Sequence, residues 1–168
     1  MADSIELYLI RHGVAADRGD EWPDDAKRPL TPEGIEKLRK SAQGLERLGV
    51  TFDVMLTSPL VRARQTADVI AAELDPHPHI AHIDSLAPGG SFQAVMADVE
   101  KQGRRTRIAL VGHEPGLGEL AARLIGTRHA LEFKKGAVCR IDVDRVPPSA
   151  SGDLRWLLTP KILRRLRP

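Results

Sequence analysis

Three short apolar segments limit the folds available to this chain more than any other feature of its sequence. They cover residues 7–10, 53–57 and 107–111, and polar or turn-forming residues follow each of them. Their length and aliphatic content are typical of buried strands. Because segments of helical periodicity separate them, we expect these strands to lie parallel in one sheet, joined by right-handed crossovers.

The remaining segments complete the expected architecture. Apolar residues recur at helical spacing in four stretches, 32–48, 61–74, 92–101 and 117–125. Thr31 is a typical N-cap for the first of these helices, with Pro32 at its first position. Towards the end of the chain, residues 137–143 alternate as a half-buried strand and 154–158 form its partner. We therefore predict a three-layer α/β/α sandwich with a mainly parallel central sheet and a C-terminal antiparallel hairpin.

Length and charge narrow the class of protein. The 168 residues suffice for one substantial core, so we expect a single domain over 1–168. Much of the net charge of +2 lies in residues 160–168, which predicts a solvated, frayed basic tail, with docking on a polyanion as the alternative. No apolar run reaches membrane-spanning length, the first residues lack a secretory signal pattern, and Cys139 has no disulfide partner. We expect a cytoplasmic protein that binds neither nucleic acid nor membrane.

Basic and imidazole side chains follow the three predicted parallel strands. The first strand leads into Arg11, His12 and Gly13, the second leads to Arg62, and the third leads to His113. Because the carboxyl ends of parallel strands meet at one crevice, these side chains are expected to converge, and Gly13 would let the backbone approach a ligand. Two histidines and two arginines, without a cluster of metal-ligand spacing, indicate a site for a tetrahedral oxyanion such as phosphate. We expect no metal and no other cofactor.

Four motifs in a fixed order connect this chain to a known family. They are RHG at 11–13, RPLTPEG at 28–34, SPLVRARQTA at 58–67 and VGHEPGL at 111–117. Together they resemble the histidine phosphatase (phosphoglycerate mutase-like) superfamily over nearly the whole chain. The short length and the segments RPLT and KKGAVCRID are similar to those of the SixA-type phosphohistidine phosphatases.

The resemblance implies a role for each residue of the predicted site. His12 would be the nucleophile that takes the phosphoryl group on a ring nitrogen, and Arg11, Arg62 and His113 would hold the phosphate oxygens. Arg28, in the RPLT segment, would reach the same pocket. The implied function is a phosphatase that acts on a phosphohistidine-containing protein.

A proton donor for the leaving group is not evident in the sequence. Members of the larger family carry an acid before the third helix, where this chain offers only Asp84. Glu114 is a second candidate, although we expect it to cap the helix that follows. Because an imidazole leaves more readily than an alkoxide, the lack of a clear acid favours phosphohistidine. Two alternatives stay open: a broader phosphomonoesterase with Asp84 as its acid, and a non-catalytic module that binds phosphate.

The loop that follows the first predicted strand is rich in acidic residues. Asp17, Asp20, Glu21, Asp24 and Asp25 lie within residues 14–27. Their charge is expected to disfavour highly anionic small substrates near this loop.

Overall fold

A computed structural model of the chain describes residues 3–167 and contains one six-stranded sheet. The strands are β1 (Ile5–Arg11), β2 (Val54–Thr57), β3 (His79–His82), β4 (Arg107–Gly112), β5 (Val138–Val143) and β6 (Asp153–Leu158). Their order in the sheet is β3-β2-β4-β1-β5-β6. Strands β3, β2, β4 and β1 are parallel, whereas β5 is antiparallel to β1 and β6 to β5. The predicted parallel sheet with a C-terminal hairpin is confirmed.

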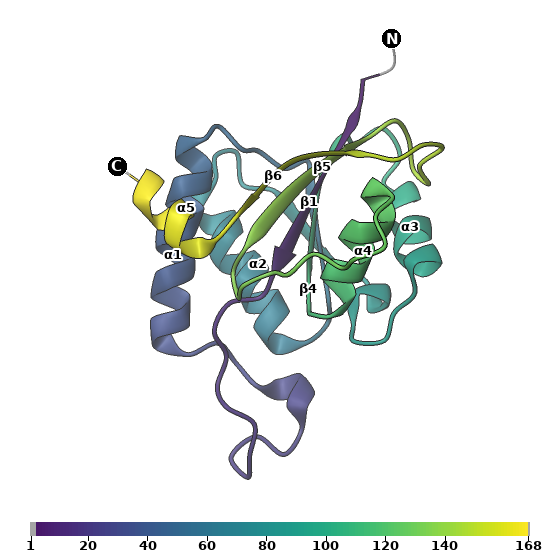
Figure 1. The fold of residues 1–168 in the computed structure, drawn as a ribbon. Helices are drawn as coiled ribbons and strands as arrows, with labels where there is room; N and C mark the ends of the chain where they lie inside the picture. The colour runs from purple at the N-terminus through teal and green to yellow at the C-terminus, as the bar shows by residue number, and fades with distance from the viewer. Residues whose placement is uncertain (1–2, 168) are drawn as a thin grey trace.

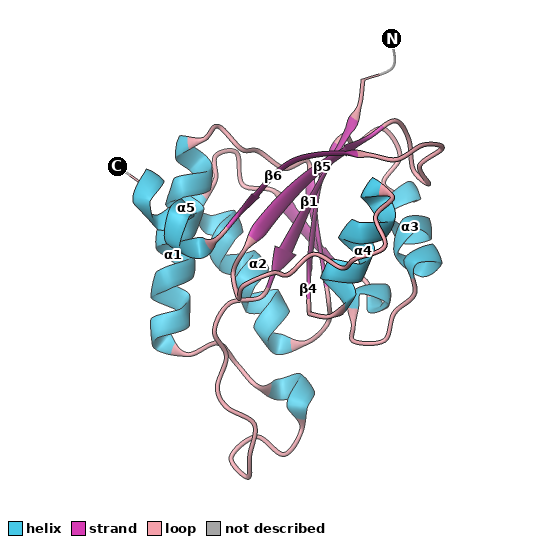
Figure 2. Cartoon of the chain, viewed as in Figure 1, coloured by secondary structure: helices cyan, strands magenta, loops and turns pink. Residues whose placement is uncertain are grey.

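Helices cover both faces of this sheet (Figure 1). They are α1 (Pro32–Arg47), α2 (Val61–Glu73), α3 (Phe92–Glu100), α4 (Gly116–Ile125) and α5 (Pro160–Leu166), with single 3₁₀ turns at η1 (Asp25–Lys27) and η2 (Asp84–Leu86). As Figure 2 shows, α3 and α4 lie on one side of the sheet and α1, α2 and α5 on the other. The three-layer sandwich is therefore confirmed.

The start of α1 illustrates how local sequence sets these elements. The hydroxyl of Thr31 accepts a hydrogen bond of 2.9 Å from the N–H of Gly34, as expected of an N-cap, and Pro32 occupies the first helical position. At the other end, Gly49 has a φ of +74°, which a glycine adopts without strain. The predicted bounds of this helix are confirmed to within two residues.

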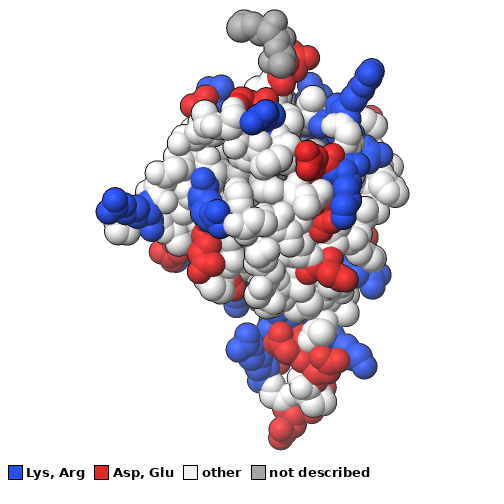
Figure 3. Space-filling view, turned by 90° about the vertical axis from the view of Figure 1, so that its right-hand side faces the viewer, with Lys and Arg blue, Asp and Glu red and all other residues white. Residues whose placement is uncertain are grey.

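The loop of residues 14–30 projects beyond the carboxyl edge of the parallel strands (Figure 1). Bridges between Ala15 and Leu30 and between Gly19 and Trp22 close it into a compact shape. Acidic and basic side chains are interspersed on the surface of this loop, as the lower part of Figure 3 shows. This loop therefore stands beside the edge at which the predicted site residues leave the sheet.

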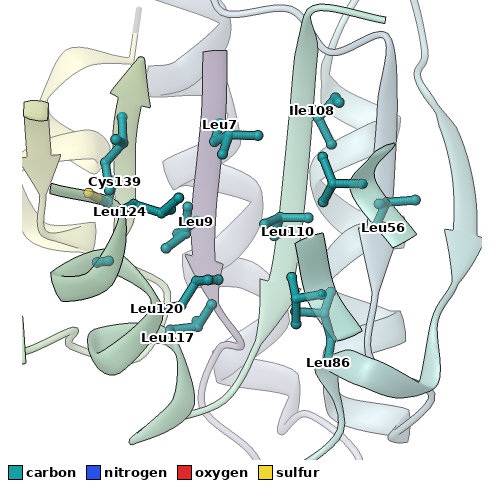
Figure 4. Close-up of a cluster of buried hydrophobic side chains, with 14 of the residues drawn as sticks. Leu7, Leu9, Leu56, Leu86, Ile108, Leu110, Leu117, Leu120, Leu124 and Cys139 are labelled. Atoms are coloured by element: carbon teal, nitrogen blue, oxygen red, sulfur yellow. The ribbon is translucent and has the colours of Figure 1, made fainter. Parts of the chain in front are cut away.

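Two hydrophobic cores hold the layers together. Leu7 and Leu9 of β1 belong to the core on the side of α3 and α4, together with Leu117, Leu120 and Leu124 of α4 (Figure 4). The alternate residues of the same strand, Tyr8 and Ile10, belong to the second core, shared with α1 and α2. Because both faces of β1 are covered, its residues form a continuous apolar run.

The C-terminal segment differs from the expectation of a frayed basic tail. Residues 160–166 form α5, whose cap is the hydroxyl of Thr159, and Leu163 is completely buried in the core shared with α1 and α2. A Cβ on Gly44 would lie 2.0 Å from the carbonyl oxygen of Leu163, so the glycine permits the close approach of α1 and α5. The expectation of a frayed end is wrong, because one buried leucine anchors a helix too short for its periodicity to be recognised, whereas the side chains of Lys161, Arg165 and Arg167 are exposed as expected. The last residue of the predicted tail, Pro168, lies outside the described residues.

Within residues 3–167, none of the helices combines the length and the apolar character needed to cross a membrane.

Candidate active site

The register of the sheet brings His12 and His113 together. Arg11 pairs with Gly112 across β1 and β4, and the N–H of His12 donates to the carbonyl oxygen of Gly112 at 3.1 Å. The two imidazoles therefore leave adjacent strand ends side by side, with 5.2 Å between their ring centroids. Both residues are buried, at 7% and 6% exposure.

Hydrogen bonds orient both rings and set the tautomer of His12. Nδ1 of His12 lies 2.7 Å from the carbonyl oxygen of Gly13, so it carries the proton and donates it, which leaves Nε2 with a free lone pair. Nε2 of His113 lies 2.8 Å from Oγ of Ser58. That hydroxyl also accepts from the N–H of Leu60 at 3.2 Å, and it keeps both a proton to donate and a second lone pair, so its bond to Nε2 fits either tautomer of His113.

Both histidines are held in the neutral form. Burial lowers the pKa of His12 to about 3, assisted by the charges of His113, Arg62 and Arg11 and opposed by the hydrogen bond to Gly13. Burial likewise lowers the pKa of His113 to about 4, and the charge of Arg62 adds to this effect. At neutral pH, His12 therefore presents an uncharged nitrogen with a lone pair.

Arg11 and Arg62 lie beside these rings, and each has N–H groups that no residue of the described chain accepts. Nη1 of Arg11 donates to the carbonyl oxygen of Phe133 at 2.7 Å, and both terminal nitrogens of Arg62 bond to Asp25. By contrast, Nε of Arg11, Nε of Arg62 and Nδ1 of His113 are buried and have no hydrogen-bond partner among residues 3–167. Because a buried donor without a partner is costly, this group of donors is suited to an anion with several oxygens.

Arg28 reaches the edge of this cluster. Its side chain is buried, its Nε donates to Oδ1 of Asp25 at 2.8 Å, and its Nη1 donates to the carbonyl oxygen of Ala16 at 2.7 Å. The charge of Arg28 also contributes to the lowered pKa of His113. Arg64, which belongs to the same sequence motif as Arg62, is exposed on α2.

Gly13 has a packing role in this structure. A Cβ on Gly13 would lie 2.6 Å from Cδ1 of Leu38, and its N–H donates to Oγ1 of Thr66 at 3.1 Å. The hydroxyl of Thr66 in turn donates to the carbonyl oxygen of Arg62 at 2.7 Å. These contacts tie α2 to the segment that holds His12, and the approach of a ligand to the backbone of Gly13 stays a prediction. Thr66 escaped the sequence analysis, although its place one turn after Arg62 is a usable signal.

The two candidate acids differ in their surroundings. Glu114 accepts hydrogen bonds from the N–H groups of Gly118 (2.7 Å) and Phe133 (3.4 Å), so it caps α4 as expected. Asp84 is exposed at the start of η2, and its side chain forms no hydrogen bond within the described part of the chain. A cavity of about 400 Å³ adjoins His113, lined mostly by residues 85–93 and the first turns of α4, and Asp84 is not among its lining residues.

Asp25 is the residue that the sequence analysis missed. Acids of the loop of residues 14–30 were expected only to repel anionic substrates, yet Asp25 bonds to both Arg28 and Arg62. The spacing of three residues between Asp25 and Arg28 is a local signal for the first pair. No local signal exists for the pair with Arg62, which lies 37 residues away.

Comparisons with known proteins agree with this arrangement. Residues 7–86 match the family model of the histidine phosphatase superfamily (branch 1). An uncharacterized protein of Picosynechococcus sp. is 42% identical over 166 residues, which cover 95% of this chain and 99% of that protein.

Phosphohistidine phosphatase SixA of Escherichia coli is 26% identical over 158 residues, covering 93% of this chain and 94% of SixA. A solved structure of the protein histidine phosphatase SixA complexed with tungstate superposes with a TM-score of 0.83 at 26% identity, over 94% of this chain and 98% of that one. The fold, the ordered motifs and these relatives lead to one conclusion: the chain belongs to the histidine phosphatase superfamily.

Proposed function

We propose that this protein is a phosphatase that removes the phosphoryl group from a protein phosphohistidine and carries it transiently on His12. One observation carries the proposal. The neutral ring of His12 lies beside three buried nitrogens, on Arg11, Arg62 and His113, that have no partner among residues 3–167, and all three are donors when His113 carries its proton on Nδ1. A tetrahedral dianion would satisfy all three donors at once.

The chemistry follows from these positions. Nε2 of His12 attacks phosphorus and forms a P–N bond, while the P–N bond of the substrate breaks. Its electron pair stays on the departing ring, which leaves as neutral imidazole because its other nitrogen carries a proton. Charge on the equatorial oxygens is stabilised by the guanidinium groups of Arg11 and Arg62 and by Nδ1–H of His113. Water then attacks the phosphorus on His12, the P–N bond breaks, and inorganic phosphate leaves. The carbonyl oxygen of Gly13 keeps the ring of His12 oriented through both steps.

Two observations support phosphohistidine as the substrate. The chain is similar over nearly its whole length to a relative named phosphohistidine phosphatase. In addition, Glu114 is engaged by backbone N–H groups as a helix cap, and Asp84 is exposed at the start of η2, which favours a leaving group that needs little protonation. An imidazole leaving group needs less protonation than an alkoxide.

The test compares kcat/KM on a phosphohistidine protein and on a phosphoserine peptide. We expect a preference of about 100-fold or more for phosphohistidine, because an absent general acid costs about that factor on an alkyl ester. His12→Ala should abolish turnover and the uptake of acid-labile phosphate, whereas His82→Ala, on an exposed histidine of β3, should change neither.

Other outcomes identify the alternatives. Equal rates on both substrates, with Asp84→Asn slow only on phosphoserine, would indicate a broader phosphomonoesterase. Phosphate binding without turnover, and without acid-labile phosphate from any donor, would indicate a binding module. Turnover that survives in His12→Ala would refute His12 as the nucleophile.

A further inference from the structure

Asp25 is the meeting point of three arginines. Its Oδ1 accepts a hydrogen bond from Nε of Arg28 at 2.8 Å and lies 3.3 Å from Nε of Arg18. Its Oδ2 accepts from Nη2 of Arg62 at 3.0 Å, and its backbone carbonyl oxygen accepts from Nη1 of the same side chain at 2.8 Å. Asp25, at the start of η1, thus contacts two arginines of the loop 14–30 and one of α2.

These contacts determine how Arg62 is oriented. The side chain of Arg62 is 4% exposed, and Asp25 engages both terminal nitrogens at the end of its planar guanidinium group. Rotating the plane would break two charge-assisted hydrogen bonds at once. The Nε–H, on the side of the guanidinium, is the buried donor that has no partner in residues 3–167.

Charge balance gives a second reason for the carboxylate. Burial lowers the pKa of Arg62, Asp25 acts in the opposite direction, and repulsion from Arg28 and Arg18 adds to the lowering. Partial burial by itself raises the pKa of Asp25, but hydrogen bonds and charge from Arg28 and Arg62 outweigh this and keep the pKa below its usual value. Asp25 is therefore charged at neutral pH and offsets part of the repulsion among the arginines.

We propose that Asp25 is a positioning residue of the phosphate site, which holds Arg62 and Arg28 in the orientation that binds the anion. This inference rests on the proposed function in one respect, that the site takes phosphate. Asp25 does not contact the phosphate itself; it acts through the two guanidinium groups. A carboxylate in the loop thereby strengthens the binding of an anion, although its charge alone would weaken it.

The test measures the Kd for inorganic phosphate by calorimetry, which requires no turnover. We expect Asp25→Asn to raise this Kd roughly tenfold or more, because the loss of orientation outweighs the gain of positive potential. Asp25→Glu should restore part of the affinity, since it keeps the charge that pairs with the arginines.

Asp24→Asn is the matched control. Asp24 is the exposed neighbour in the same loop, its side chain caps η1 at the N–H of Ala26, and asparagine serves equally well as a cap. Asp24→Asn removes the same charge from a side chain that contacts no arginine in residues 3–167. The Kd of this variant for phosphate should therefore stay within about a factor of two of the wild-type value. The thermal midpoints of both variants should match that of the wild type to within a few degrees, which shows that both remain folded.

Several results would overturn the proposal. Tighter phosphate binding in Asp25→Asn would mean that Asp25 competes with phosphate for Arg62. An unchanged Kd, or an equal change in Asp24→Asn, would mean that orientation by Asp25 is unimportant. If the wild-type protein bound no phosphate at millimolar concentration, there would be no phosphate site for Asp25 to support, and the proposal would be wrong. The proposed function is judged separately by turnover of the two substrates, so it can fail while Asp25→Asn still weakens phosphate binding.

Discussion

At the scale of single residues, the site depends on burying imidazoles beside cations. A histidine at the surface is partly protonated near neutral pH, and a protonated ring has no lone pair with which to attack phosphorus. Burial and the neighbouring guanidinium groups remove this limitation for His12, and the carbonyl oxygen of Gly13 selects the ring nitrogen that stays free. In the proposed mechanism, the same residues that bind the substrate would thus also activate His12.

This environment makes a prediction for nuclear magnetic resonance. In buffer free of phosphate and sulfate, the ¹⁵N signals of the His12 and His113 rings should keep the neutral form from pH 7 down to about pH 5, because their pKa values are about 3 and about 4. The proton should lie on Nδ1 of His12. Loss of the signals in His12→Asn and His113→Asn assigns them. A midpoint near 6.5 for either ring, or a proton on Nε2 of His12, would contradict the structure.

At the scale of elements, parallel strands and their register do most of the assembly. Arg11 pairs with Gly112 across β1 and β4, and Thr57 pairs with Val111 across β2 and β4. Residues that follow these pairs leave the sheet at one edge, which brings the hydroxyl of Ser58 to His113 although 55 residues separate them. At the C-terminal end of the described chain, α5 packs against α1, and its Leu163 is buried in the core that α1 and α2 share.

The docking of α5 can be tested by a pair of variants. Leu163→Ala should lower the free energy of unfolding by roughly 2–4 kcal/mol, because it leaves a cavity where a completely buried leucine packs. Ile162→Ala changes the neighbouring residue, which is 47% exposed, and should cost about 0.5 kcal/mol or less beyond helix propensity. Urea unfolding of both variants measures the difference. Equal and small effects would show that α5 does not contribute to the core.

At the scale of the whole molecule, the two neutral histidines link stability to pH. Each has a pKa of 6.5 when unfolded, above its value of about 3 or about 4 when folded, so the unfolded chain binds more protons in acid. The contribution of each ring is fully present above pH 6.5 and is lost as the pH falls. Between pH 7 and pH 5, we expect about 2 kcal/mol of stability to be lost for each histidine.

Urea unfolding at several pH values in phosphate-free buffer checks this expectation. The double variant His12→Asn/His113→Asn should be less sensitive to acid than the wild type, whatever its absolute stability. His82→Asn, which changes an exposed histidine, serves as the control and should keep the wild-type slope. If the double variant lost stability as steeply as the wild type, the two rings would not be the source of the acid sensitivity.

The sequence alone determined the architecture and the residues at its centre. The parallel sheet, the hairpin and the helix caps follow from local periodicity and from residues such as Thr31 and Gly49, because these signals lie within a few neighbouring positions. The sequence also predicts the candidate site residues, because each lies at or soon after the end of a predicted strand. They are Arg11, His12, Arg62 and His113. The carboxyl ends of parallel strands meet at one edge of the sheet, so the fold class alone predicts that these residues lie close together.

Only the tertiary structure decided which groups complete the site. The bond from Arg11 to the carbonyl oxygen of Phe133 spans 122 residues, the contact between Arg62 and Asp25 spans 37, and Leu163 enters a core formed by α1 and α2. Such contacts depend on where a loop closes and on which surface a short helix meets. No pattern of neighbouring residues encodes them, because the energy that selects them comes from burying groups that are distant in the chain.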